Sequence, residues 1–315
     1  MKDKNTKFRI VDALLILMMV LPLVAAMAIK VCTPLIDAWL YNQPIPEVSD
    51  GVTIAGAHIF FTIPMPIQDL IITEAQINAW LILIAVLGAC LFFTHGLKED
   101  KRDWRQMAAE WVVEKVDGLV ESSMEELFRK SYAPFIAAIL AYSACSSLMS
   151  LIGVFPPTSD VNVIAGWSIL VFALITKNKL KAGFGNYGKG FLEPIPVMLP
   201  MNILGEVATP ISMTFRHFGN VMSGSVIATL IAWALQNLSR MVLGWLPGIL
   251  GEIPFLQIGI PAVLSVYFDV FSGCIQAYIF AMLTMLNISG AYPADAIAER
   301  LAKREARKAK KAKVA

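Results

Sequence analysis

The chain contains apolar blocks of about twenty residues or more, and these blocks limit its possible folds more than any other feature. The block at residues 11–29, "VDALLILMMVLPLVAAMAI", is an example. A helix of that length crosses a hydrocarbon core of about 30 Å. Hydrophobic residues make up 57% of the chain and charged residues 16%, which excludes an ordinary soluble domain. Apolar and polar residues do not alternate as in a membrane barrel. The sequence predicts an all-α polytopic membrane protein.

The first apolar block, residues 11–29, has two interpretations. Four basic residues precede it, which favours a retained helix that starts in the cytoplasm. Ala26-Met27-Ala28 also has the small-x-small form of a signal-sequence cleavage site. Under both interpretations we expect residues 31–74, which carry no basic residue, to form an external segment.

Further membrane spans are expected at residues 75–97, 134–154 and 163–176. The apolar stretches 196–236 and 258–290 are longer than one perpendicular span requires, and each fits either a helical hairpin or one steeply tilted helix. This gives six spans, or five if the first block is removed. Residues 104–127 place apolar residues at helical spacing opposite acidic ones, which predicts an amphipathic helix on the membrane surface.

Three other segments favour simple interpretations. "GFGNYGKG" (residues 183–190) approaches a phosphate loop, but Gly190 stands where Ser or Thr would bind magnesium, so we expect a flexible cytoplasmic loop. Residues 293–315 form a basic tail, interpreted as a cytoplasmic segment near anionic lipid and not as a nucleic-acid-binding module. The cysteines and histidines have no metal or disulfide spacing, and no cofactor or metal is expected.

Arg216 lies inside the long apolar stretch, within "MTFRHFGNVMSG". A charged side chain in the middle of a bilayer costs about 2.5–3.5 kcal/mol on insertion scales, so an arginine there usually has an interior partner and a function. Asn220 and Ser223 fall on roughly its side of the helix, with Glu206 slightly off this polar stripe. The alternative is an arginine that snorkels or holds the bundle through an ion pair.

The last apolar stretch carries a second polar stripe, whose members are three, four or seven residues apart. They are Ser265, Asp269, Ser272, Gly273 and Gln276. One cationic and one acidic stripe on two helices outline an ion path. His217 adjoins Arg216 but points about 100° away, so we expect it to tune the site and not to act alone.

Four stretches resemble subunit a, the membrane stator subunit of F-type ATP synthase. "PISMTFRHFGNVMSG" resembles the family signature "SLRLFGNxxAG", and "CIQAYIFAMLTMLNI" resembles the family's last helix. "PPTSDVNVIAGWSILVF", which contains Asp160 and Asn162, and "LPMNILGEVATPIS", which contains Glu206, match two further stretches. The resemblance covers about residues 75–292, so the first 30 residues and the basic tail lie outside it.

The resemblance implies a rotary ion path. Two aqueous half-channels would reach into the bilayer from opposite sides, and a ring of c subunits would turn past them. Arg216 would face the ring carboxylate and separate the half-channels, while Asn220 and Gln276 would orient it. This chain departs from the family pattern at Ser225, where some members carry Glu, at Asp269, where His or Glu is common, and at His217, where Leu is usual.

The resemblance also implies partners and a location. The partners would be the c ring, the b subunits of the peripheral stalk, other ATP synthase subunits and lipid, in the cell inner membrane with a cytoplasmic C-terminus. Flow of H⁺ or Na⁺ would be coupled to ATP synthesis or hydrolysis by the whole complex, because this chain shows no nucleotide site. A secondary transporter would favour internal repeats, which are not seen, and a purely structural scaffold would not need two polar stripes.

Overall fold

The fold is taken from a computed structural model that describes residues 2–40, 56–66, 69–97, 103–192, 195–243, 259–261, 263–264, 266–291, 298 and 301–302. The chain forms two compact units, and each is described by itself. Unit 1 comprises Met1–Ala108, Ala141–Val163 and His217–Ala277, and unit 2 comprises Ala109–Leu140, Ile164–Arg216 and Tyr278–Ala315. Ser265, most of the predicted basic tail and much of the predicted external segment lie outside the described residues.

Six helices in the described part of the chain are long and apolar enough to cross a membrane, which confirms the polytopic, predominantly helical fold. They are Arg9–Leu35, Glu74–Thr94, Phe128–Ile152, Val161–Lys181, Pro196–Leu243 and Gly259–Ser289. Their apolar lengths match or exceed the roughly 20 residues that a bilayer requires.

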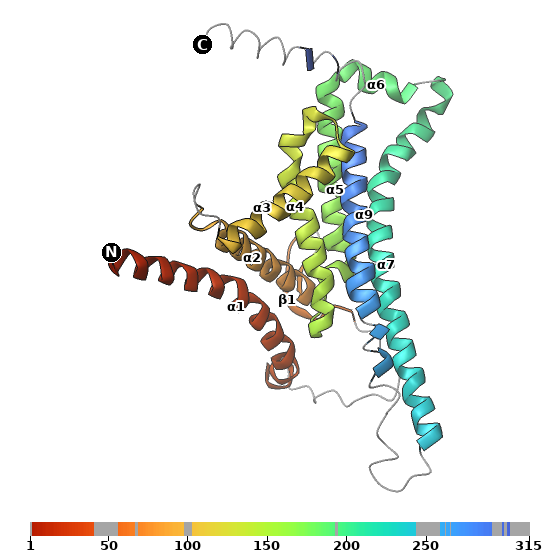
Figure 1. The fold of residues 1–315 in the computed structure, drawn as a ribbon. Coiled ribbons are helices and arrows are strands. Elements are labelled where there is room, and N and C mark those ends of the chain that lie inside the picture. The colour runs from red at the N-terminus through yellow and green to blue at the C-terminus, as the bar shows by residue number, and fades with distance from the viewer. Residues whose placement is uncertain are drawn as a thin grey trace. The chain divides into compact units, whose positions relative to one another are not determined.

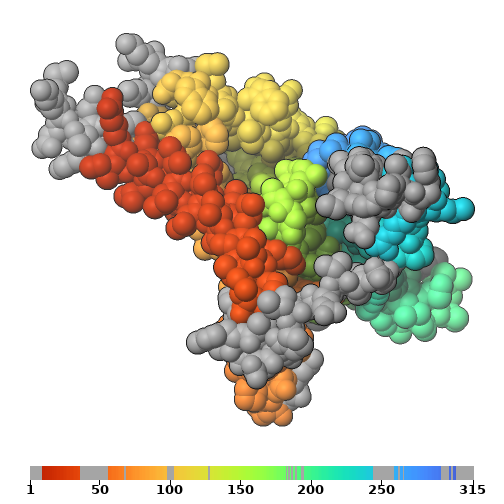
Figure 2. Space-filling view, turned by 90° about the horizontal axis from the view of Figure 1, so that it is seen from below, coloured from red at the N-terminus to blue at the C-terminus, as the bar shows by residue number. Residues whose placement is uncertain are grey.

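The first helix, α1 (Lys2–Leu40), continues well past the apolar block. It packs along α2 (Glu74–Thr94), and the two lie side by side in Figure 1. The helices approach closely at Gly88, where an added Cβ would lie 3.0 Å from the main chain of Met18. Glycine at this position therefore sets the distance between the two helices. In Figure 2 much of α1, in red, lies at the molecular surface.

The predicted external segment contains a small β-hairpin, which the all-helical expectation missed. Strand β1 (Ile59–Ile63) pairs antiparallel with β2 (Leu70–Thr73). Both strands are rich in β-branched or aromatic residues, which favour extended structure. Both runs are short and almost continuously apolar. Hydrophobic periodicity therefore cannot distinguish a strand here from the end of a helix.

The predicted surface helix begins as expected but ends early. α3 (Trp104–Ser123) is followed directly by α4 (Glu126–Leu148), which begins ahead of the predicted residue 134. Trp104, Met107 and Trp111 are exposed along the first half of α3. Val120 is fully buried, so the second half of this amphipathic helix packs on protein.

Short turns connect α4 to α5 (Val161–Ala182) through η1 (Met149–Ile152) and η2 (Pro157–Ser159). The predicted flexible loop at residues 183–190 is wrong, because residues 184–190 lie in a helix, α6 (Phe184–Leu192). The rings of Tyr187 and Phe191, one turn apart, meet at 4.9 Å between centroids. This aromatic spacing supports the helix despite the glycines.

Each of the two long apolar stretches is one helical segment and not a hairpin. After η3 (Pro196–Met198), α7 (Leu199–Leu243) runs for 45 residues, about 68 Å at 1.5 Å per residue. That exceeds the thickness of a hydrocarbon core roughly twofold, which is the length expected of a strongly inclined helix. The last stretch is a π-helix, η5 (Val266–Ser272), continued by α9 (Gly273–Ser289). π-helical turns often occur at functional sites.

The core of unit 2 is an apolar cluster to which α3, α4, α5, α7 and α9 contribute. Ile136, Val171 and Met285 are each fully buried within it. The rings of Trp167 and Phe280 meet edge to face, with 6.1 Å between centroids. Burial of such side chains is worth about 1.5–3 kcal/mol each and fixes the helices of this unit against one another.

Candidate functional site

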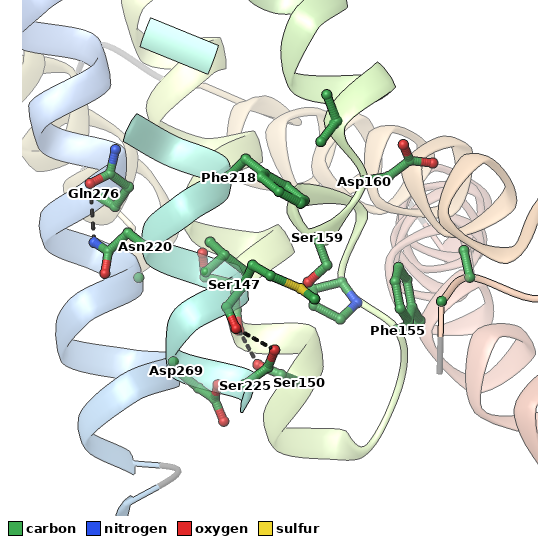
Figure 3. Close-up of a pocket in the computed structure, with 18 of the residues that line it drawn as sticks. Ser147, Ser150, Phe155, Ser159, Asp160, Phe218, Asn220, Ser225, Asp269 and Gln276 are labelled. Atoms are coloured by element: carbon green, nitrogen blue, oxygen red, sulfur yellow. Dashed lines mark hydrogen bonds between the residues drawn. The ribbon is translucent and has the colours of Figure 1, made fainter. Parts of the chain in front are cut away.

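Unit 1 contains a cavity of about 830 Å³ that is lined by both polar and apolar residues. Its wall is built by the hairpin, the end of α4 with η1, the turn through η2 into α5, the middle of α7, and η5 with the start of α9. Figure 3 shows the side chains that line it. Segments far apart in the sequence therefore meet at one cavity.

Six of the ten site residues predicted from the sequence line this cavity. They are Asp160, Asn162, Asn220, Ser225, Asp269 and Gln276. The other four, Glu206, Arg216, His217 and Ser223, are not among its lining residues.

Asn220 connects the two polar stripes. Its Nδ2 donates to Oε1 of Gln276 at 3.1 Å, and its Oδ1 accepts a hydrogen bond from Ser272 Oγ at 3.1 Å. Gln276 is only 3% exposed, so its amide needs such a partner. The predicted stripes on α7 and on the last helix thus meet through side-chain hydrogen bonds (Figure 3).

Two glycines bring the helices of unit 1 close enough for these contacts. A Cβ added at Gly273 would lie 2.5 Å from Ser147 Cβ, and one at Gly224 would lie 3.3 Å from the Phe268 ring. Gly273 therefore allows α9 to approach α4, and Gly224 allows η5 to approach α7. Larger side chains would widen both gaps.

Asp269 projects from η5, the π-helical turn, and is half buried. The side chain of Ser150, in η1, lies within hydrogen-bonding reach of its carboxylate. Asp160 belongs to a different wall, directly before α5. Its Oδ1 accepts a hydrogen bond from the backbone N–H of Asn162 at 2.9 Å, in the manner of a helix N-cap.

The turn that carries Asp160 is held from two sides. Asn78 of α2 is 1% exposed and donates from Nδ2 to the carbonyl oxygen of Phe155 at 2.9 Å. Thr158 N–H donates to Ser146 Oγ at 3.1 Å, and both residues are fully buried. These buried hydrogen bonds fix the wall in which Asp160 lies.

Sequence reasoning missed the polar face formed by α4 and η1. Ser143, Ser146, Ser147 and Ser150 follow one another at intervals of three, one and three residues. Ser147 and Ser150 line the cavity, while Ser143 and Ser146 are buried behind them. The helical spacing of serines within "YSACSSLMS" was the available signal. Single hydroxyls are common inside membrane helices, so this pattern is less conspicuous than an arginine or a carboxylate.

The charged lining of the cavity is acidic. Within the described part of the chain, Asp160 and Asp269 are the lining residues with ionisable carboxyl groups, and no Lys, Arg or His lines the wall. The other polar lining residues carry hydroxyl or amide side chains. Such a set of oxygen atoms suits a cation or water and not an anion.

Glu206 lies in a separate site in unit 2. Lys179 Nζ donates to both of its carboxylate oxygens, at 2.8 and 2.6 Å. The Tyr187 side chain lies beside this pair, and partial burial, followed by the nearby Glu206 carboxylate, raises the pKa of its phenol. Glu206 is thus the acceptor of an ion pair at the basic end of α5.

The remaining predicted residues lie along α7. Ser223 is exposed and donates to the Asn220 carbonyl of its own helix, whereas the His217 side chain is fully buried. Arg216 is exposed and precedes Asn220 by one helical turn. None of the carboxylates that the structure describes forms an ion pair with Arg216.

Fold and site together define a multi-pass membrane protein with a cavity among its helices whose charged lining residues are acidic. The family model of the ATP synthase A chain matches residues 77–289. The chain therefore belongs to the ATP synthase A chain family, whose members are subunits of an ATP synthase complex. Among the described residues no group of three or more His, Cys, Asp or Glu side chains could hold a metal ion.

Curated relatives agree with this assignment. ATP synthase subunit a of Bacillus pumilus is 32% identical over 234 residues, covering 70% of this chain and 89% of that protein. The subunit a of Geobacter sulfurreducens is 30% identical over 233 residues, covering 71% and 91%. A sodium-ion-specific subunit a of Propionigenium modestum is 26% identical over 269 residues, covering 75% and 85%.

Proposed function

We propose that this chain is the ion-translocating stator subunit of a rotary ATP synthase and that Arg216 separates two aqueous half-channels. The observation that carries the proposal is an exposed arginine inside a span, one turn before the Asn220–Gln276 contact. An unpaired charge within a bilayer is costly, which favours a partner on another chain. A carboxylate of the c ring, facing α7, would supply that partner.

The cavity is the proposed half-channel on the outer side of the membrane. Its two carboxylates and its hydroxyl and amide groups support passage of a cation, H⁺ or Na⁺. Ions would enter past Asp160 and Asp269. These two residues would supply the acidic groups of the path, because this chain has Ser225 at the position where some family members carry Glu. Asn220 and Gln276 would hold the inner end of the path in place.

Domain roles and orientation follow from the same proposal. Residues 75–292 would form the ion-translocating domain, and residues 31–74 would lie outside. The C-terminus and the Lys179–Glu206 pair would face the cytoplasm, because basic residues favour that side. α3 would lie at the membrane surface and contact the peripheral stalk. The nucleotide chemistry would belong to other subunits of the complex.

The decisive test is Arg216→Ala in the assembled complex. We expect ATP-driven ion pumping to fall to background and passive ion leak to rise, because the fixed positive charge both releases the ring ion and blocks a direct path. The measurements are pumping and leak in inverted membranes, with assembly checked by subunit content.

Arg240→Ala is the matched control, since Arg240 lies in the last turn of the same helix. It should retain most of the pumping. Unimpaired pumping by an assembled Arg216→Ala complex would contradict the proposal and leave Arg216 with a structural role.

A further inference from the structure

We infer that the hairpin β1–β2 is a wall of the outer ion-entry path, so that cations pass its cavity-facing residues before they reach Asp269. This inference rests on the proposed function and extends it to a segment that the family model does not match. The matched region begins at residue 77, whereas the hairpin ends at Thr73.

The hairpin takes part directly in the cavity. Ile59 of β1 and Ile71 and Thr73 of β2 line it, together with Gly56 and Ala57 just before the first strand. Ile59 pairs with Thr73 across the strands, so their side chains belong to one face of the hairpin. We call Ile59, Ile71 and Thr73 the inner face.

Successive residues of a strand point to opposite faces, which separates Ile71 from its neighbour Leu70. Leu70 does not line the cavity, although its exposure, 47%, is nearly equal to the 45% of Ile71. The two positions therefore lie on different faces of the hairpin but have nearly the same solvent access. The hairpin, in orange, stands at the surface in Figure 2, and the proposed orientation places it on the outer side.

The hairpin is anchored at the start of α2. Glu74 N–H donates to the His58 carbonyl oxygen at 2.7 Å, and Thr73 Oγ1 caps α2 by accepting from Gln76 N–H at 3.4 Å. Lys30 of α1 pairs with the Glu74 carboxylate at 3.3 Å. A two-stranded hairpin alone is marginally stable in water, so these contacts hold it in place.

The charge of the cavity lining determines which solutes can pass along the hairpin. Behind the inner face the described charged lining residues are Asp160 and Asp269. They attract cations into the cavity and repel anions, and the low-dielectric wall strengthens both effects. An apolar strand surface at the entrance narrows the path without offering a competing binding site.

Thiol labelling tests the inference in the assembled complex. The four native cysteines, Cys32, Cys90, Cys145 and Cys274, are first replaced by serine, and Ile71→Cys or Leu70→Cys is then introduced. Intact cells are treated from outside with a cationic or an anionic methanethiosulfonate, and ATP-driven pumping is measured in inverted membranes prepared afterwards. Each rate is compared with that of the same variant without reagent.

We expect the cationic reagent to modify Ile71→Cys several times faster than the anionic one and to reduce pumping at least fivefold. Leu70→Cys should be modified to the same extent, with little preference for either charge, and keep its pumping. Ile59→Cys, on the same inner face, replaces Ile71→Cys if that variant does not assemble. Complete modification at the inner face with unchanged pumping, or no modification there, would overturn the inference.

Ser225→Cys separates failure of this inference from failure of the proposed function, because Ser225 lines the same cavity from α7 and does not belong to the hairpin. If modified Ser225→Cys stops pumping and modified Ile71→Cys does not, the hairpin is no part of the path but the half-channel stands. If modified Ser225→Cys pumps as before modification, the half-channel assignment itself is wrong.

Discussion

Among single residues, Asn220 is the most constrained in its position, because its one amide group forms hydrogen bonds with side chains on two segments. It donates to Gln276 and accepts from Ser272, both at 3.1 Å. Asn220→Leu keeps the approximate volume but leaves the buried Gln276 carbonyl oxygen without its donor. That loss costs about 1–3 kcal/mol. If the whole cost appears in the translocation step, ATP-driven pumping falls about five- to 150-fold.

Asn237→Leu provides the control for this prediction. Asn237 lies on the same helix, is exposed, and bonds only the Trp233 carbonyl of its own turn among the contacts described. It should pump within about twofold of the unaltered chain. A double variant, Asn220→Leu with Gln276→Leu, should lose much less than the sum of the two single losses. Additive losses would show that the two amides act independently.

At the scale of elements, the packing of α9 on α4 depends on Gly273. An added methyl group would lie 2.5 Å from Ser147 Cβ, closer than such atoms approach. Gly273→Ala should therefore push the helices apart and lower the thermal midpoint of the purified complex by several degrees, equivalent to about 1–3 kcal/mol of overpacking. The measurement is thermal unfolding in detergent.

Two further variants make this prediction specific. Gly166→Ala, on α5, meets no atom within 4 Å and should leave the midpoint unchanged or raise it, because alanine favours helices. Ser147→Gly should restore the midpoint in the Gly273→Ala background by removing the opposing atoms. Failure of this rescue would show that another contact limits the approach of α9.

The sequence predicted those features that depend only on the spacing of residues along one helix. Arg216 and Asn220 on one helix, and Asp269 with Gln276 on another, were visible because charged and amide groups are rare in apolar stretches. The family resemblance implied that Asn220 and Gln276 lie beside Arg216, but the hydrogen bond between the two amides was not predicted. The hairpin and α6 were missed, since their stability depends on tertiary contacts and on aromatic pairs, which outweigh local propensity.

Across the whole molecule, the first apolar block was the main ambiguity, because a retained helix and a cleaved signal share composition and charge. The contacts of α1 favour retention. Asp12 makes a bidentate pair with Arg105, with both N···O distances 2.9 Å, and Lys30 pairs with Glu74. The Asp12 carboxylate, through these hydrogen bonds, raises the pKa of the Arg105 guanidinium, which stays charged. These contacts thus attach α1 to the rest of unit 1 near both ends of its apolar part.

We therefore expect the mature protein to keep α1. The candidate cleavage site lies inside the helix, and Ala26 is 1% exposed against its neighbours, whereas a peptidase needs an accessible, extended segment. The intact mass of the subunit from the assembled complex should equal that of the full chain. Ala28→Leu removes the small residue that cleavage requires and should change the mass only by the substitution. A chain lacking about its first 28 residues, with the Ala28→Leu variant uncleaved, would instead identify the block as a signal sequence and leave five spans.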